Sequence, residues 1–222
     1  MSYIGKTPTP APLTSSDIAS DIINNTHIGD TAISGFDALA TAPADTDEFL
    51  ISDGGVLKRI DASLVGGGGI TMAESWRVTA NFTGDATTIN SNWEKTDTNG
   101  YGNIGSSMTE SSGIFTFPST GIYYINFRTS QWGGGGAINT FGAVRIQTTT
   151  DNSSYDTASE NYSNNFHIDS YSGATTEFIF DVTNTTTHKV LFAVVVNHNG
   201  TITLGDTGND RTTAKFIRLG DT

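Results

Sequence analysis

The sequence has no cysteine among its 222 residues. Disulfide bonds, thiolate metal sites and thiol nucleophiles are therefore excluded together. The chain is long enough to fold without such cross-links, because a domain of about 150 residues buries roughly 70% of its unfolded surface. We expect one domain of about that size plus an additional segment, assembled in a reducing cytoplasm.

Positive charge and long apolar runs are also scarce. The chain carries 11 Lys and Arg against 23 Asp and Glu, a net charge of −12, which would repel a polyanion and predicts no nucleic-acid partner. The longest apolar run, 190–196, has the length of a strand rather than the roughly 18 residues of a membrane span. The first residues lack the charged start and apolar centre of a signal peptide, so we expect neither membrane insertion nor export by a standard route.

Catalytic and cofactor motifs are missing as well. There is no Gly-x-Ser-x-Gly elbow and no His-Glu-x-x-His spacing. Residues 100–105 match Gly-x-Gly-x-x-Gly, but they lead into a predicted strand instead of the helix that a dinucleotide site requires. The sequence predicts no enzyme, cofactor or metal site; a depolymerase would instead need paired carboxylates about 5 to 10 Å apart in a groove.

Glycine, threonine, serine and asparagine supply most of the polarity and are typical of a β-rich chain with many turns. The clearest pattern is 113–127, two short strands joined by Pro118-Ser119-Thr120-Gly121. Because side chains alternate along a strand, Phe115 and Phe117 share one face, and Tyr123, Ile125 and Phe127 share another. We predict that these five side chains form the hydrophobic core. The turn-rich remainder predicts an all-β sandwich or barrel.

The phrase Gly113-x-Phe115-x-Phe117-Pro118-x-x-Gly121-x-Tyr123-Tyr124 resembles the central signature of the C1q/TNF-like jelly roll. Trp93-Glu94-Lys95, Asn99-Gly100-Tyr101 and the ending 190–219 are also similar to that family. The resemblance runs from about residue 74 to 221. It implies a jelly-roll sandwich and a homotrimer more strongly than it implies any ligand.

The N-terminal third has a different character. Residues 1–40 are expected to form an extended arm, since alternating prolines favour polyproline II, with Tyr3, Ile4 and Leu13 as apolar anchors on a partner or, alternatively, a free terminus. Residues 41–69 hold a predicted hairpin, with strands at 47–52 and 56–60 and an Asp-Gly-Gly turn, and end in a Gly66–Gly69 linker. These segments resemble parts of tailed-phage fibre and virion proteins. The jelly-roll domain is expected at 70–222.

Further strands are predicted in this domain at 75–78, 88–93, 140–148, 177–182, 188–196, 202–204 and 215–219, with a long polar loop at 151–165. The strand 190–196 is apolar at every position, which indicates that both of its faces are buried. A neighbouring subunit would cover one face, or a loop of the same chain would. On the first interpretation the candidate trimer contacts are Tyr124, Phe192, Val194 and Val196.

Aromatic residues among polar segments are the best indication of a ligand. Trp132, Tyr155, Tyr162 and Tyr171 are candidate receptor contacts, because rings beside amides and carboxylates commonly bind sugars. The alternative is that they seal the ends of the sandwich.

Together these features favour a phage virion fibre or spike protein. Its arm would bind another virion protein of the tail, nozzle or capsid, and its trimeric domain would attach to a host-surface glycan. The alternative is a decoration or connector protein of the virion without receptor binding.

Overall fold

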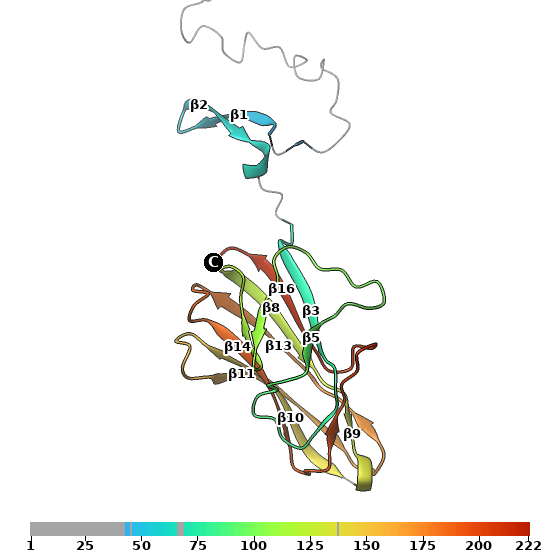
Figure 1. Cartoon of the computed structure of the whole chain (residues 1–222). Helices are drawn as coiled ribbons and strands as arrows, with labels where there is room; N and C mark the ends of the chain where they lie inside the picture. Colours follow the sequence, from blue (N-terminus) through green and yellow to red (C-terminus); the bar gives the residue numbers. More distant parts are fainter. Residues whose placement is uncertain (1–42, 45, 66–68, 137) are drawn as a thin grey trace, which may run out of the picture. The chain divides into compact units, whose positions relative to one another are not determined.

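The computed structural model describes residues 43–44, 46–65, 69–136 and 138–222 (Figure 1). The chain divides into two compact units, Met1–Gly67 and Gly68–Thr222. The predicted arm with Tyr3, Ile4 and Leu13 lies outside the described residues. Within the described ranges, no helix is both long and apolar enough to cross a membrane.

The first unit contains the predicted hairpin. Strand β1 (Glu48–Asp53) pairs antiparallel with β2 (Val56–Asp61), and a 3-10 turn, η2 (Ala62–Leu64), follows. Gly54 and Gly55 have φ of 59° and 84°, the positive values that a two-residue hairpin turn requires. Every residue of β1 is exposed, so this hairpin buries no core of its own.

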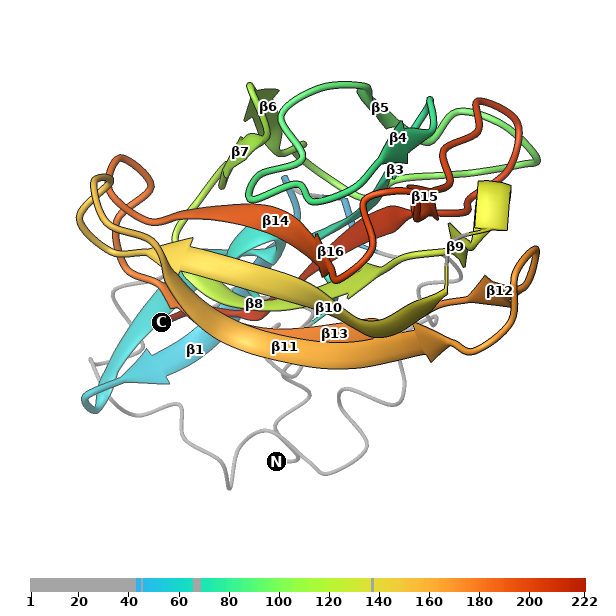
Figure 2. The same ribbon diagram turned by 90° about the horizontal axis from the view of Figure 1, so that it is seen from below.

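The second unit is a sandwich of two five-stranded antiparallel sheets (Figures 1 and 2). The first sheet has the order β13-β8-β16-β3-β5, and the second has the order β11-β10-β14-β7-β6. The strands of the first sheet are β3 (Met72–Val78), β5 (Trp93–Lys95), β8 (Gly121–Arg128), β13 (Thr175–Val182) and β16 (Thr213–Gly220). Those of the second are β6 (Thr109–Ser111), β7 (Ile114–Thr116), β10 (Asn139–Thr149), β11 (Asp156–Asn165) and β14 (Lys189–Val196).

A small four-stranded sheet of order β12-β9-β15-β4 lies at one end of the sandwich. Its strands are β4 (Phe82–Thr83), β9 (Gln131–Trp132), β12 (Tyr171–Ser172) and β15 (Ile202–Thr203), and the 3-10 turn η3 (Gly134–Gly136) follows β9. Along the chain the long strands cross repeatedly from one main sheet to the other. This all-β arrangement is a jelly roll, as the sequence predicts.

The core contains the five side chains predicted for it. Phe115, Phe117, Tyr123, Ile125 and Phe127 are each at most 2% exposed. The predicted turn also forms, but the strands that it joins do not pair with each other. Strand β7 pairs with β6 and β14, whereas β8 pairs with β13 and β16, so the turn crosses between the sheets. The five side chains therefore meet from opposite walls of the sandwich.

Two predicted local structures are wrong. Residues 88–92 form no strand. This segment and the residues just before it contact β14 through single bonds, such as Ile89 N–H to Phe192 O and Ala86 N–H to Val194 O, rather than a ladder. Residues 156–165, predicted as a loop, form the ten-residue strand β11. Strand β11 is the edge strand of the second sheet, so it pairs with one neighbour only and exposes much of its surface to solvent. An exposed edge strand can consist of polar residues, and this polar sequence is why the segment was predicted as a loop.

The apolar strand β14 is buried without help from a second subunit. Phe192 and Val194 are 0% exposed and belong to the core, and Val196 is nearly buried as well. On the opposite face of the strand, Leu191 and Ala193 are also buried within the single chain. The prediction that Phe192, Val194 and Val196 contact a neighbouring subunit is therefore wrong, because these side chains present almost no surface to one.

Candidate functional site

The structure brings two of the four predicted receptor contacts together. Trp132 in β9 and Tyr171 in β12 lie opposite each other in the ladder, and their rings stack with centroids 6.4 Å apart. Tyr171 is 72% exposed. Gly134 in η3 lies against the Trp132 ring, since an added Cβ there would come within 2.7 Å of it. These elements lie at the end of the sandwich opposite to the start of β3 and the C-terminus (Figure 1), here called the aromatic end.

Tyr162, near the end of β11, packs on Phe141 of β10 with ring centroids 5.4 Å apart. Both side chains are exposed, as are Phe166 and Ile168 in the connection from β11 to β12. The Tyr162 hydroxyl donates to Glu160 at 2.5 Å, which raises the pKa of the tyrosine and lowers that of the carboxyl. The aromatic end therefore exposes three apolar side chains that were not among the predicted receptor contacts, those of Phe141, Phe166 and Ile168.

Tyr155 is not part of this group. It precedes β11, at the end of that strand opposite to Asn165, and is half-buried. Its buried hydroxyl has no hydrogen-bond partner among the described residues, and burial raises its pKa. Of the four predicted receptor contacts, the structure thus places Trp132, Tyr162 and Tyr171 toward the aromatic end and separates Tyr155 from them.

An apolar row crosses the outer face of the first sheet. In strand register, Ile179 lies opposite Tyr124, Tyr124 opposite Ile217, and Ile217 opposite Ala73, which pairs with Ile104 in an isolated bridge. We call these five residues the apolar belt. Ile179 is 60% exposed and Ile104 49%, while the three between them are half-buried. Of the predicted trimer contacts, only Tyr124 lies on this face.

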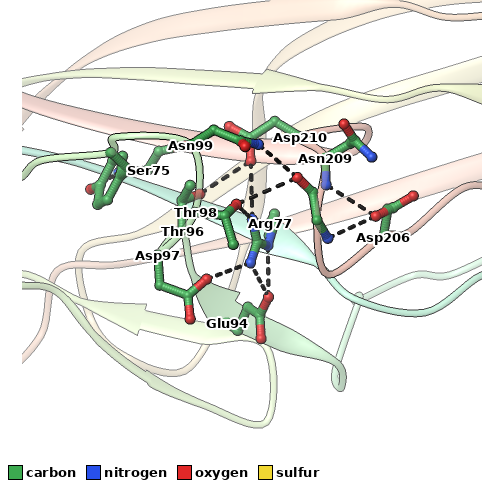
Figure 3. Close-up of polar contacts among 12 residues, drawn as sticks. Ser75, Arg77, Glu94, Thr96, Asp97, Thr98, Asn99, Asp206, Asn209 and Asp210 are labelled. Atoms are coloured by element: carbon green, nitrogen blue, oxygen red, sulfur yellow. Dashed lines mark hydrogen bonds and ion pairs between the residues drawn. The ribbon is translucent and has the colours of Figure 1, made fainter.

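A buried arginine organises one edge of the same sheet (Figure 3). Arg77 of β3 has a side chain only 1% exposed, and Glu94 lies directly across from it on β5. Its guanidinium contacts Glu94 and Asp97 at 2.6 Å each, and Asp210 lies at 3.9 Å. Burial by itself would lower the pKa of Arg77, but the bonds to Glu94 and Asp97 outweigh it and raise the pKa, so the side chain stays charged.

No local sequence pattern marks this cluster. Arg77 lies in a predicted strand like any polar residue, and its partners come from segments up to 133 positions away, at Glu94, Asp97 and Asp210. Among the described histidines, His188 is buried and bonds to the hydroxyls of Thr183 and Thr187. Among the described residues, no group of three or more His, Asp or Glu side chains could hold a metal ion.

These features define an all-β protein of the jelly-roll class. Solved structures with a similar fold include murine APRIL at pH 5.0, which is 12% identical with a TM-score of 0.46 and covers 67% of this chain and 98% of its own. Another is the Eiger TNF from S. frugiperda, which is 11% identical with a TM-score of 0.47 and covers 69% of this chain and 96% of its own. No protein-family model and no curated protein matches the sequence.

Proposed function

We propose that this chain is a homotrimeric adhesion protein of a phage particle, which attaches to the host surface through the aromatic end. The observation that carries the proposal is the exposed aromatic surface around Trp132 and Tyr171. It lies at the end opposite to the point where the chain enters the sandwich (Figure 1). An end far from the attachment point is free to reach a receptor, and stacked rings are suited to the apolar faces of sugars.

The apolar belt supports the trimeric part of the proposal. Contiguous exposed apolar residues on a soluble domain mark a protein contact, and the belt spans four strands on one face of the first sheet. A cyclic homotrimer would bury this face three times with the same residues. The resemblance of 113–124 to the C1q/TNF-like signature supports the same stoichiometry. Three weak sites on one rigid trimer would then give firm attachment through multivalency.

The test combines mass and binding. Light scattering on the full chain should give three times the monomer mass, and the labelled trimer should bind intact cells of the bacterial host and compete with infection. Tyr171→Ala should reduce this binding without changing the mass, whereas Thr186→Ala, an exposed residue between β13 and β14, should leave it unchanged.

The other outcomes discriminate between the alternatives. A trimer that binds no cells would overturn adhesion and favour a decoration or connector protein of the virion. A monomer would overturn the trimeric part. If the Tyr171→Ala variant binds cells as well as the unaltered chain does, the receptor contact does not lie at Tyr171 of the aromatic end.

A further inference from the structure

A polar hollow lies beside the Arg77 cluster, apart from both the aromatic end and the apolar belt. It has a volume of about 340 Å³, within the range of roughly 300–1,000 Å³ found for small-molecule sites. One wall is the segment 96–101, which follows β5, and the other is the loop 206–210, which precedes β16. The side chains of Thr96, Asn99, Tyr101, Asn209 and Asp210 line it.

The two walls are fixed relative to each other before any ligand arrives. Asn99 Nδ2 donates to Gly208 O at 2.9 Å, and Thr96 Oγ1 bonds to Asp210 Oδ1 at 3.3 Å. Beneath them, Arg77 donates to Thr98 Oγ1 at 2.7 Å and binds Asp97, which ties the first wall to the sheet (Figure 3). A site that is already ordered loses little entropy on binding.

An unsatisfied group lies next to this hollow. A second hollow of about 240 Å³ shares Tyr101 and Asp210 with the first and extends over Ser75 to Ala73 and Ile217 of the apolar belt. The Ser75 N–H donates to the Tyr101 hydroxyl at 2.7 Å, which holds the ring between the two spaces. Ser75 itself is 5% exposed, and its Oγ has no hydrogen-bond partner among the described residues. Buried hydroxyls are normally paired, so the Ser75 hydroxyl is available for a hydrogen bond with a hydroxyl group that enters the second hollow.

The charges of the lining select the class of ligand. Asp210 supplies a carboxylate, and Asn99 and Asn209 supply amides, but no cation lines the first hollow. Arg77 beneath it is buried and faces three carboxylates, those of Glu94, Asp97 and Asp210, while Lys215 lines the second hollow. Three carboxylates around one guanidinium leave an excess of negative charge beside the hollow, which disfavours an anionic sugar or a phosphate, while the carboxylate and amides of the lining can form hydrogen bonds with sugar hydroxyls. We propose that this hollow binds a neutral saccharide.

The experiment uses the full chain and defined probes. Saturation-transfer NMR and calorimetry would be run with the methyl glycosides of glucose, galactose, mannose and N-acetylglucosamine. N-acetylneuraminic acid and a sulfated hexose serve as anionic counterparts. We expect saturable binding of at least one neutral glycoside and none of the anionic probes.

Two variants place the binding in the hollow. Asp210→Asn keeps the shape and removes the carboxylate, and Asn209→Ala removes an exposed side chain; each should weaken binding about tenfold, as loss of a hydrogen bond to a charged or polar group does. Asn103→Ala, an exposed asparagine outside the hollow, and Tyr171→Ala, at the aromatic end, should bind as the unaltered chain does.

The proposal is overturned if no neutral glycoside binds, if both hollow variants bind normally, or if the anionic probes bind better. Circular dichroism of each variant would confirm that it is folded. Because the readout involves no cells, failure here leaves the adhesion proposal standing, and failure of adhesion leaves this site standing.

Discussion

At the scale of single residues, Gly113 shows why the recognisable signature requires a particular residue type. Its φ is 82°, and an added Cβ would lie 2.4 Å from Ile89 O. The position thus combines a left-handed backbone, costly for other residues, with a close approach of another segment. We predict that Gly113→Ala lowers the free energy of unfolding by about 2 kcal/mol or more.

Urea denaturation monitored by tryptophan fluorescence would measure the effect. The matched control is Gly102→Ala, because an added Cβ there meets nothing within 4 Å and no positive φ is involved. We expect the control to change the unfolding free energy by less than about 0.5 kcal/mol. Similar losses in both variants would show that the close approach at Gly113 has no energetic weight.

Arg77 carries the second prediction at this scale. Arg77→Met keeps most of the packing volume but leaves Glu94, Asp97 and Asp210 without their shared cation. Breaking a fully buried ion pair costs roughly 3–5 kcal/mol. Asp97 is 72% exposed and can rehydrate, so we expect a smaller loss of about 1–3 kcal/mol.

Urea denaturation of the variant and of the unaltered chain at pH 7 measures this loss. An unchanged free energy of unfolding would show that the ion pairs of Arg77 contribute nothing to stability.

These two residues also mark what the sequence could reveal. Gly113 and the five core side chains from Phe115 to Phe127 were predictable, since they follow one another in a recognisable strand–turn–strand pattern. The role of Arg77 was not predictable, because it depends on Asp210 from a distant loop and no local pattern encodes that proximity. Trp132 and Tyr171 were each singled out, but only the β9–β12 pairing makes them one surface.

At the scale of elements, the turn between β10 and β11 depends on one carboxylate. Asp151 Oδ1 accepts from the backbone N–H groups of Ser153 and Ser154 at 2.8 and 3.0 Å, and Thr149 Oγ1 donates to it at 2.7 Å. These bonds hold the pKa of Asp151 well below its usual range. A folded-state pKa below the unfolded one contributes stability that is present above the usual aspartate pKa and is lost as the pH falls toward the folded value.

We therefore predict that Asp151→Ala lowers the melting temperature at pH 7, and that the difference from the unaltered chain narrows below about pH 4. Melting curves from pH 7 to pH 2 would record it. Asp156→Ala, an exposed aspartate at the start of β11, is the control and should show a smaller effect at pH 7. Equal effects of the two substitutions would contradict a special role for Asp151.

Strands were predicted correctly where their buried positions carry apolar residues. Strands β10, β13, β14 and β16 were found within a few residues because buried positions there are apolar. Strand β11 was not predicted because its side chains are mostly polar and show no apolar alternation. It is a strand because its backbone pairs with β10. The burial of both faces of β14 was predicted, but the sequence left two sources of cover open, since periodicity cannot distinguish a neighbouring subunit from the same chain. The structure shows that the same chain supplies the cover.

At the scale of the whole molecule, the apolar belt is the feature that a single copy of the chain leaves unexplained. Ile179 is 60% exposed in the middle of a strand, at one end of an apolar row that continues through Tyr124 and Ile217. Burying a carboxylate there without a partner would be costly. We predict that Ile179→Glu converts the proposed homotrimer to a monomer at micromolar concentration, as measured by light scattering.

The control is Ile168→Glu, which introduces the same charge at a similarly exposed isoleucine near the aromatic end. It should remain trimeric, because its side chain lies outside the belt. A trimeric Ile179→Glu variant with unchanged dissociation would show that the subunits associate through another surface.

The same pair of variants separates association from recognition. If attachment depends on three linked sites, a folded Ile179→Glu monomer should lose cell binding by a factor of about 10²–10⁴. Its affinity for a neutral glycoside in the hollow beside Arg77 should be unchanged, since that hollow is lined by one chain. Calorimetry and cell binding on the same preparation measure both quantities. If the monomer loses both cell binding and glycoside affinity, the saccharide site needs a neighbouring subunit. If it retains both, a single copy of the chain is sufficient for adhesion.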